Sequence, residues 1–354
     1  MESAKLVFRD QSPRILIARL SAIGDCILTL PLACALRDVC PHAYIAWAAE
    51  NAGAKLLDGH PALDEVIRVP KRVLRSPAGV WNLRGQLRRR QFDITLDPQG
   101  LSKSAAIAWL SGAPRRIGFQ RPVGREISPW LNTELIHGGQ AHVVDRYRQL
   151  LSPFATSLPP VRFDLPSDAT TREKVATFLA AADFSAGFLV INPGAGWDSK
   201  LWPAERFAEV ARQLGLAADL PSLVVWAGER EAAWARQIVA GSGGWARLAP
   251  PTTLPELAEV VRQARLFIGS DTGPMHLAAA VGTRCVGLFG TTQPAECGPY
   301  GAFHLAIQSY YQGGSCRTRR TAPNLAMQAI TIEAVVAGAL QVLGLPRVLN
   351  SRVA

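Results

Sequence analysis

The sequence predicts an α/β protein with two domains, each built on a parallel sheet with helices on both faces. Its 354 residues exceed what one ordinary core holds, at roughly 150 residues per domain. Strand-like and helix-like segments alternate along most of the chain, the pattern of β-α-β units. A stretch rich in proline and serine, typical of a linker, interrupts the alternation at residues 151–170. We therefore expect Rossmann-like domains at residues 1–165 and 166–330, and a helix and tail at 331–354 that pack back on the first domain.

Runs of apolar and β-branched residues, bounded by glycine, proline or aspartate, mark the elements of the first domain. It is expected to begin with a strand at Arg14–Leu20 and a helix at Cys26–Val39. Its further strands are expected at Ala43–Ala48, Glu65–Val69, Phe92–Leu96 and Arg116–Phe119, and a second helix at Leu101–Leu110.

The second domain repeats the alternation. Strands are expected at Phe188–Asn192, Ser222–Ala227, Leu266–Gly269 and Arg284–Phe289. Helices are expected at Ala204–Leu214, Glu229–Val239, Leu254–Ala264, Met275–Val281 and Thr331–Leu343. Because ligands of open α/β sheets bind at the carboxyl ends of the strands, we expect the two sheets to face each other across a cleft that binds the ligands.

The composition describes a soluble globular protein with an anionic partner. Apolar residues make up 48% of the chain and charged residues 19%, and the net charge is +10. The six cysteines show no C-x-x-C spacing, so we expect reduced thiols, a cytoplasmic location and no metal site or cofactor. No apolar stretch approaches the ~20 residues that span a bilayer, so any membrane contact would be peripheral.

Residues 191–203, INPGAGWDSKLWP, suggest a phosphate site. A strand leads into a glycine-rich turn with Gly194 and Gly196, and Lys200 follows. Glycines let backbone N–H groups approach an anion closely, and the lysine adds a positive charge. The alternative is an ordinary strand–helix connection with a solvated lysine.

Residues 267–282, FIGSDTGPMHLAAAVG, place Asp271, Thr272 and Gly273 at the start of a helix whose free N–H groups suit a diphosphate. Ordinary helix capping would account for Asp271 and Thr272 but not for His276. Glu229 follows a buried strand, where an acid commonly accepts hydrogen bonds from ribose hydroxyls or simply begins a helix.

Residues 21–25, SAIGD, place an acid at the turn between the first strand and its helix. Gly24 allows a tight turn, and Asp25 either caps the helix or acts as a general base. Residues 84–125 carry nine cations against two acids, which favours a phosphorylated or carboxylated ligand. Nucleic acid is disfavoured because few aromatic residues lie among these cations and no DNA-reading motif occurs.

Taken together, these segments resemble the family 9 glycosyltransferases, the ADP-heptose:lipopolysaccharide heptosyltransferases. The resemblance covers nearly the whole chain and is carried by five blocks: ILIARLSAIGDCILTLPL, FDITLDPQGLSKSAAIAWLSGAPRRIGF, AHVVDRYRQLL, NPGAGWDSKLWPAERFAEV and SDTGPMHLAAAVGTRCVGLFGTTQP. It implies a GT-B fold, with the acceptor bound by the N-terminal domain and the nucleotide sugar by the C-terminal one. It also implies an inverting, metal-independent transfer.

The resemblance also assigns roles to residues. Asp25 would be the general base that takes a proton from the acceptor hydroxyl. Lys200 would steady the diphosphate together with the N–H groups of Thr272 and Gly273. Of the remaining donor residues, Asp271 would contact the heptose, Glu229 the ribose and Thr252 the adenine, while His276 belongs to the same donor motif.

The resemblance implies that the acceptor is Kdo-lipid A or a related lipopolysaccharide core. The segments that would border the acceptor resemble heptosyltransferase I more than heptosyltransferase II. The acceptor-binding residues would be Ser21, Gly24, Lys103, Arg116, Arg125, His142 and Arg146. The positive net charge suits a Kdo carboxylate, lipid A phosphates and peripheral contact with the cytoplasmic face of an anionic inner membrane. The chain departs from many relatives in the glycine turn, which lacks hydroxyl residues, and at Ala326–Met327, where several have a C-M dipeptide.

Other functions stay open on the sequence alone. A family 9 enzyme could use another nucleotide sugar or another surface glycan. A nucleotide-sugar epimerase shares the two-domain arrangement, and a non-catalytic protein could bind nucleotide sugars or anionic glycans. Nucleic-acid binding is the least favoured alternative.

Overall fold

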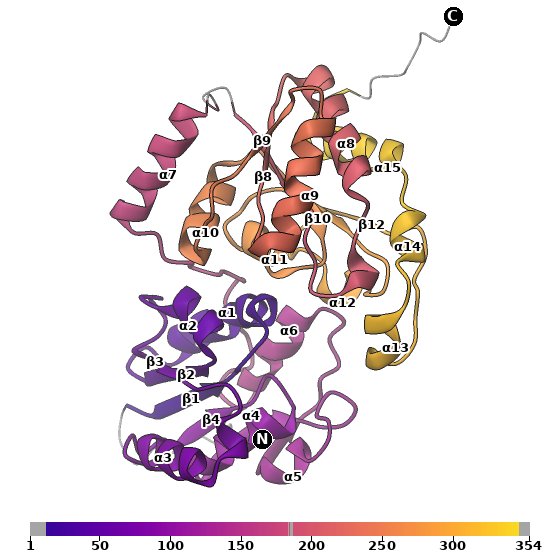
Figure 1. The fold of residues 1–354 in the computed structure, drawn as a ribbon. Helices are drawn as coiled ribbons and strands as arrows, with labels where there is room; N and C mark the ends of the chain where they lie inside the picture. Colours follow the sequence, from indigo (N-terminus) through magenta and orange to yellow (C-terminus); the bar gives the residue numbers. More distant parts are fainter. Residues whose placement is uncertain (1–11, 183, 185–186, 347–354) are drawn as a thin grey trace, which may run out of the picture. The chain divides into compact units, whose positions relative to one another are not determined.

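The computed structural model describes residues 12–182, 184 and 187–346, and the chain divides into two compact units. The first comprises Met1–Pro166 and the second Ser167–Ala354 (Figure 1). Each is built on a six-stranded parallel sheet flanked by helices, so the α/β fold with two Rossmann-like domains is confirmed. The unit boundary lies within the linker segment that interrupts the alternation in the sequence.

The first sheet has the strand order β3-β2-β1-β4-β5-β6. Its strands are β1 (Arg14–Ala18), β2 (Tyr44–Ala49), β3 (Glu65–Arg68), β4 (Ile94–Leu96), β5 (Arg115–Phe119) and β6 (Glu134–Ile136). The chain builds outward from β1 to β3 and then returns to place β4 on the other side of β1. This reversal is the topological switch point at which open α/β sheets bind ligands.

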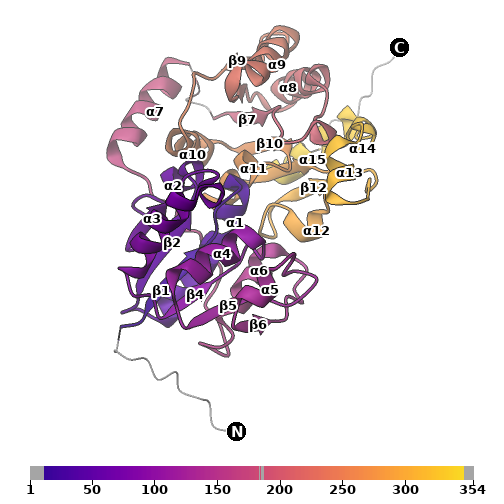
Figure 2. The ribbon, with the colours of Figure 1, turned by 60° about the horizontal axis from the view of Figure 1, so that its bottom comes forward.

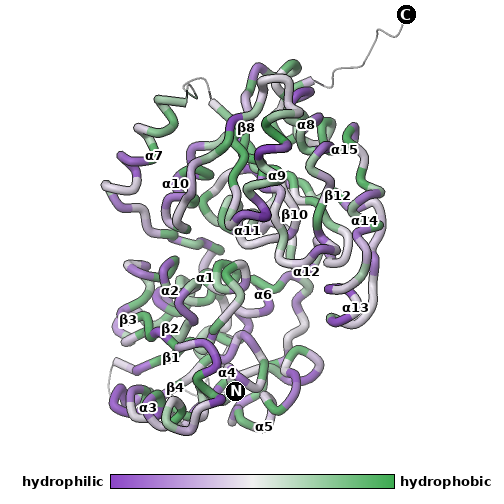
Figure 3. Tube along the Cα trace, in the orientation of Figure 1, coloured by the Kyte–Doolittle hydropathy of each residue, from purple (hydrophilic) through white to green (hydrophobic). Residues whose placement is uncertain are grey.

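Two layers of helices cover this sheet. α1 (Ile23–Val39), α2 (Asn51–Leu57) and α6 (Val143–Arg148) pack together on one side. On the other side α3 (Pro77–Arg88), α4 (Ser102–Ser111) and α5 (Ser128–Leu131) lie next to one another (Figure 2). α1 is buried and largely hydrophobic, whereas α3 carries hydrophilic residues (Figure 3).

α1 begins at Ile23, three residues before the start predicted from the sequence. Gly24 and Asp25 therefore lie in its first turn, and the Asp25 carboxylate accepts a hydrogen bond from the Ala22 N–H at 3.3 Å. An acid in this position also interacts favourably with the positive end of the helix dipole. The local fold thus fixes Asp25 immediately beyond the carboxyl end of β1.

The second sheet has the order β12-β11-β10-β7-β8-β9. Its strands are β7 (Leu189–Asn192), β8 (Ser222–Val224), β9 (Ala246–Leu248), β10 (Leu266–Ser270), β11 (Cys285–Leu288) and β12 (Leu305–Ile307). Its helices are α7 (Ala169–Ala181), α8 (Ala204–Ala218), α9 (Gly228–Gly241), α10 (Leu254–Gln263), α11 (Gly273–Ala280), α12 (Pro294–Cys297), α13 (Cys316–Thr321), α14 (Leu325–Gln328) and α15 (Ile332–Leu343). Counted outward from β7, its strand order repeats that of the first sheet, with the switch point between β7 and β10.

The closing helix α15 packs within the second unit. Its apolar residues Val335, Ala339 and Leu340 share a core with α8 and with strands β10 and β11. We expected residues 331–354 to form a helix and tail that pack back on the first domain. The helix contributes to the core of the second unit, where its apolar residues are buried, and residues 347–354 lie outside the described residues. None of the helices described has both the length and the apolar character needed to cross a bilayer.

Gly215, near the end of α8, gives a test of this packing. A Cβ built on Gly215 would lie 2.1 Å from Cδ2 of Trp245, whereas one on Gly85 in α3 would meet only the Arg89 Nη2, at 3.9 Å. We expect Gly215→Ala to lower the free energy of unfolding by about 1–3 kcal/mol through overpacking. The control Gly85→Ala should raise it by about 0.5–1 kcal/mol, because alanine favours the helix.

Urea denaturation of both variants measures the two changes. A stabilised Gly215→Ala protein would contradict the tight contact between α8 and Trp245.

Candidate active site

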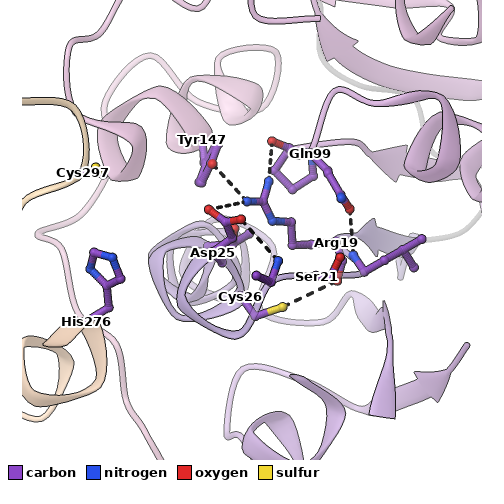
Figure 4. A network of polar contacts seen from close by, with 12 residues as sticks. Arg19, Ser21, Asp25, Cys26, Gln99, Tyr147, His276 and Cys297 are labelled. Atoms are coloured by element: carbon purple, nitrogen blue, oxygen red, sulfur yellow. Dashed lines mark hydrogen bonds and ion pairs between the residues drawn. The ribbon is translucent and has the colours of Figure 1, made fainter. Parts of the chain in front are cut away.

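In the first unit, a buried arginine and a half-exposed acid meet directly after β1 (Figure 4). The Arg19 Nη2 lies 2.9 Å from the Asp25 Oδ1, and the two side chains are 4% and 46% exposed. One carboxylate oxygen is therefore held by a buried cation while the side chain remains accessible from solvent. The helix cap and the accessible base, which the sequence offered as alternatives for Asp25, are geometrically compatible.

Arg19 is held by groups from three parts of the first unit. Its Nη1 donates to the Pro98 carbonyl and its Nη2 to the Tyr147 hydroxyl, both at 3.2 Å. The guanidinium also lies 5.0 Å from the centre of the Tyr147 ring. Burial opposes the charge, but the Asp25 carboxylate and Tyr147 outweigh it and hold the pKa of Arg19 above its usual range. Asp25 thus has a permanent cation beside it.

The loop after β4 supports the same turn. Gln99 Oε1 accepts a hydrogen bond from the Leu20 N–H at 2.9 Å. Asp97, which is fully buried, accepts from the Gly100 N–H and the Ser128 hydroxyl, each at 3.0 Å. Burial raises the pKa of Asp97. The D-P-Q-G stretch therefore acts as a scaffold for residues 19–25.

Lys103 and Ser21, two of the expected acceptor residues, are joined at this turn. The Lys103 Nζ donates to the Ser21 hydroxyl at 2.5 Å and lies 3.5 Å from the Glu50 Oε1. Gly24 lies one residue before Asp25 in the first turn of α1. Glu50, which follows the neighbouring strand β2, was not predicted as a site residue, although its position after a predicted strand was a usable signal.

Four other expected acceptor residues have local structural contacts. Arg116 donates to the carbonyls of Leu131 and Ala113, both at 2.8 Å. Arg146 donates to the carbonyls of residues 140 and 141, and His142 Nδ1 accepts from the Val144 N–H at the start of α6. Arg125 is exposed, and its N–H donates to the Gly100 carbonyl. These contacts give the four residues structural roles that need no ligand.

In the second unit, a buried charge cluster lies at the ends of β7 and β10. Lys200 Nζ is 2.6 Å from Asp271 Oδ2, and His276 Nε2 is 3.1 Å from Asp271 Oδ1. Burial would raise the pKa of Asp271, but the His276 hydrogen bond and the Lys200 charge outweigh it and hold that pKa well below its usual range. The structure thus brings together three residues that the sequence assigned to one donor site.

Backbone N–H groups border this cluster. No side chain caps the start of α11, which leaves N–H groups at its first turn for an anion. Asn192 Nδ2 donates to the Thr272 hydroxyl at 3.3 Å and so ties the turn after β7 to the turn after β10. Thr252 is partly buried and directly precedes Thr253, the N-cap residue of α10.

The glutamate that adjoins the glycine turn is Glu231 rather than Glu229. The side chain of Glu229 is 91% exposed, and its nearest cation is Arg236 at 3.9 Å. Glu231 Oε2 accepts from the Ala227 N–H at 2.8 Å, and a Cβ on Gly194 would lie 2.2 Å from Glu231 Oε1. Burial raises the pKa of Glu231. Sequence spacing gave no basis for choosing between two acids in the same helical turn.

Two further residues contact the cluster. The ring centre of Trp197 lies 4.4 Å from the Lys200 Nζ and 5.0 Å from the Arg320 Cζ. The Cys297 Sγ lies 3.6 Å from the Asp271 Oδ2, and burial is the main reason that the pKa of this thiol is raised. Trp197 follows the predicted glycine turn directly, whereas Arg320 lies 120 positions downstream of Lys200 and had no signal in the sequence.

The fold matches that of two-domain glycosyltransferases of the GT-B class. A family 9 glycosyltransferase from Veillonella parvula superposes with a TM-score of 0.82 at 23% identity, over 95% of this chain and 98% of that one. The E. coli heptosyltransferase WaaC with ADP-2-deoxy-2-fluoro heptose superposes with a TM-score of 0.73 at 24% identity, over 93% and 99%.

Sequence comparison gives the family. Lipopolysaccharide heptosyltransferase 1 of Pseudomonas aeruginosa is 31% identical over 315 residues, which is 86% of each chain. The Salmonella typhimurium enzyme of the same name is also 31% identical, over 84% of this chain and 94% of its own. The profile "Glycosyltransferase family 9 (heptosyltransferase)" matches residues 80–326. The chain belongs to glycosyltransferase family 9, so it is a glycosyltransferase, and the epimerase alternative loses its support.

The charge cluster around Asp271 predicts a pH-dependent stability. Because the pKa of Asp271 is lowered on folding, its carboxylate stabilises the fold above the unfolded pKa of about 3.9. That stabilisation is lost as the pH falls through the lower pKa of the folded state. The difference in unfolding free energy between the wild type and Asp271→Asn should therefore be largest near about pH 7 and shrink below about pH 4.

Urea denaturation across this pH range measures the effect. The control is Asp198→Asn, which removes an ion pair to Arg230. Because Asp198 and Arg230 are 70% and 64% exposed, this substitution should change the unfolding free energy little at any pH. An Asp271→Asn difference that is constant with pH would contradict the lowered pKa.

Proposed function

We propose that the protein is an inverting heptosyltransferase of lipopolysaccharide synthesis. It would move a heptose from ADP-L-glycero-D-manno-heptose to a hydroxyl of Kdo-lipid A or heptosyl-Kdo-lipid A. The observation that carries the proposal is the half-exposed Asp25 carboxylate, fixed by the buried Arg19 at the end of β1. It is supported by relatives named lipopolysaccharide heptosyltransferase 1 that are 28–31% identical to this chain.

In the proposed reaction, Asp25 acts on the acceptor. Oδ1 is engaged by Arg19, so we assign proton transfer to Oδ2, which has only a long contact of 3.3 Å with the Ala22 N–H among the hydrogen bonds of the described residues. As the acceptor oxygen bonds to the anomeric carbon of the heptose, its proton passes to Oδ2. The bond from that carbon to the ADP oxygen breaks on the opposite face, and ADP leaves with the bonding electrons.

The second unit would bind the donor. Lys200 and the N–H groups of Thr272 and Gly273 meet the charge that builds on the leaving diphosphate. We propose a metal-independent reaction without a cofactor because these groups already supply positive potential there. Asp271, oriented by Lys200 and His276, would accept a hydrogen bond from a heptose hydroxyl.

The rest of the nucleotide would lie along the turns that follow β7 and β8. We assign the ribose contact, first expected at Glu229, to Glu231, because Glu231 adjoins Gly194. The turn has open space beside Gly196, since a Cβ there would meet no atom within 4 Å. Thr252 stays a proposed adenine contact.

The acceptor would lie against the first unit. Lys103, held between Ser21 and Glu50, is the cation that we assign to the Kdo carboxylate or a lipid A phosphate. Arg125 is exposed and suits a second anionic group, whereas Arg116, Arg146 and His142 would shape the acceptor side through their main-chain contacts. Because this acceptor is anchored in lipid, we propose that the protein works on the cytoplasmic face of the inner membrane.

Asp25→Asn gives the direct test of the base. Its kcat should fall by roughly 10²–10⁴-fold while the KM for the donor changes little, because Asp25 acts on the acceptor oxygen and not on the donor. The measurement is ADP release from ADP-heptose with and without Kdo-lipid A. The control Asp58→Asn changes an acid of similar exposure, 44%, whose ion pair with Arg68 lies outside the proposed site.

Near-full turnover by Asp25→Asn would overturn the base assignment. Tight ADP binding without release to Kdo-lipid A would keep the donor site and favour another surface-glycan acceptor of family 9. ADP binding without turnover of any nucleotide sugar would favour the non-catalytic binding protein.

The two glutamates of α9 give a second test. We expect Glu231→Gln to raise the Kd for ADP by roughly 10-fold or more, because a hydrogen bond to a charged group contributes about that much to binding. Glu229→Gln should change it less than about 2-fold, because its carboxylate is solvated. Isothermal titration calorimetry with ADP measures both. The reverse order of effects would return the ribose contact to Glu229.

A further inference from the structure

Three neighbouring helices of the first unit each present an exposed tryptophan. Trp81 lies on α3, Trp109 on α4 and Trp130 on α5, with side chains 71%, 53% and 76% exposed. α3 contacts α4, and α4 contacts α5, in the layer on one side of the sheet (Figure 2). We call the outer surface of these three helices the tryptophan face.

The three indoles have no part in the core of the unit. α3 packs through Leu83 and Leu87, and α4 packs through Ile107 and Leu110, all of them buried against the sheet. Ile127, just before α5, adds another apolar side chain at 45% exposure. Exposed indoles on adjoining helices of one layer are the kind of apolar surface that serves as an interaction site when the side chains form a patch.

The segments that contain α3 and α4 are basic. Residues 70–92, which include α3, carry seven cations and no acid: Lys71, Arg72, Arg75, Arg84, Arg88, Arg89 and Arg90. Residues 98–125, which include α4, carry five more and no acid: Lys103, Arg115, Arg116, Arg121 and Arg125.

Ion pairs use only some of these cations. Arg90 is paired with Glu65 and Arg115 with Glu134, whereas Arg88 and Arg89 are exposed at the end of α3. Arg84 lies 5.7 Å from the ring centre of Trp81. Arg84 and Arg88 lie on α3 and Arg89 directly follows it, so basic side chains and the exposed indole of Trp81 are combined there.

We propose that the tryptophan face docks the protein on the surface of an anionic phospholipid bilayer, with the indoles at headgroup depth. Indole rings favour this boundary because one edge is apolar and the N–H can hydrogen-bond. Arginines near the surface add attraction to anionic headgroups. Two copies meeting face to face would oppose like charges, which disfavours a second copy as the occupant. The proposal rests on the proposed function only for the choice of membrane.

Co-sedimentation of the full chain with vesicles tests the face without donor or acceptor. The wild type should bind vesicles of phosphatidylglycerol and phosphatidylethanolamine far more tightly than vesicles of phosphatidylcholine. The variant Trp81→Ala/Trp109→Ala/Trp130→Ala should lose roughly 10- to 100-fold in vesicle affinity. The variant Arg84→Gln/Arg88→Gln/Arg89→Gln should lose about 10-fold or more at low salt only.

The matched control removes three comparably exposed apolar side chains of the second unit: Leu216→Ala/Phe303→Ala/Leu325→Ala, at 64%, 53% and 52% exposure. It should bind vesicles like the wild type. Lipids brominated near the headgroup should quench tryptophan fluorescence of the wild type and of this control, and quench the three-tryptophan variant less. Thermal unfolding of each variant checks that the fold is kept.

Equal vesicle binding by the three-tryptophan variant and the wild type would overturn the proposal. The proposal would also be overturned if wild-type binding disappeared at high salt and the brominated lipids did not quench tryptophan fluorescence. The protein would then bind the vesicles through charge alone. Concentration-dependent dimerisation abolished by the tryptophan changes would assign the face to a second copy instead.

Turnover separates this proposal from the proposed function. The three-tryptophan variant should keep wild-type ADP release with a deacylated, water-soluble acceptor and lose it with acceptor in vesicles. A wild type that binds vesicles but transfers to no acceptor would overturn the proposed function and leave the docking face intact.

Discussion

Arg19 carries a positive charge into the interior of the first unit, one residue beyond the end of β1, and its surroundings are arranged to balance that charge. The Pro98 carbonyl comes from the loop after β4, the Tyr147 hydroxyl from α6 and the Asp25 carboxylate from α1. A buried cation without such partners would cost several kcal/mol. The geometry of the turn at residues 19–25 is thus a condition for burying Arg19, and Asp25 is fixed as a consequence.

In the second unit the buried charge is that of an anion, and it also has oppositely charged and hydrogen-bonding partners. Asp271 is buried, and Lys200 and His276 compensate it from two sides. In each unit, a side-chain hydrogen bond joins the two loops that flank the switch point: Gln99 to the Leu20 N–H in the first, and Asn192 to Thr272 in the second. Pre-formed charge pairs of this kind hold polar groups in place before a ligand arrives, which lowers the reorganisation needed when it binds.

Much of the site could be predicted from the sequence because its residues follow strands. Asp25, Gly194, Lys200 and Asp271 stand in turns after apolar runs, and strand topology then dictates where those turns gather. The edge strands β6 and β12, of three residues each, were not predicted. The equally short β4 and β8 were predicted because they lie in longer segments rich in apolar residues, Phe92–Leu96 and Ser222–Ala227.

Contacts between residues distant in sequence could not be predicted. Glu231 and Glu229 differ only in which one faces Gly194, and that depends on the packing of α9 against the turn after β7. Arg116 lies in the basic segment at residues 84–125 and Arg146 in the block AHVVDRYRQLL, and nothing in their neighbours showed that their guanidiniums would bond to main-chain carbonyls. The pattern of charges led to the hypothesis of an anionic ligand, whereas the contacts of each charged side chain required the fold.

The identical strand order of the two sheets has an evolutionary consequence. Each unit runs outward from its first strand to its third, then back across to its fourth, fifth and sixth, and each keeps its polar groups on the loops after the first and fourth strands. Because each half has its own core, mutations that retune one set of loops need not disturb the other. In the proposed reaction, where each half binds one substrate, recognition of the sugar donor and recognition of the acceptor could therefore change separately during evolution.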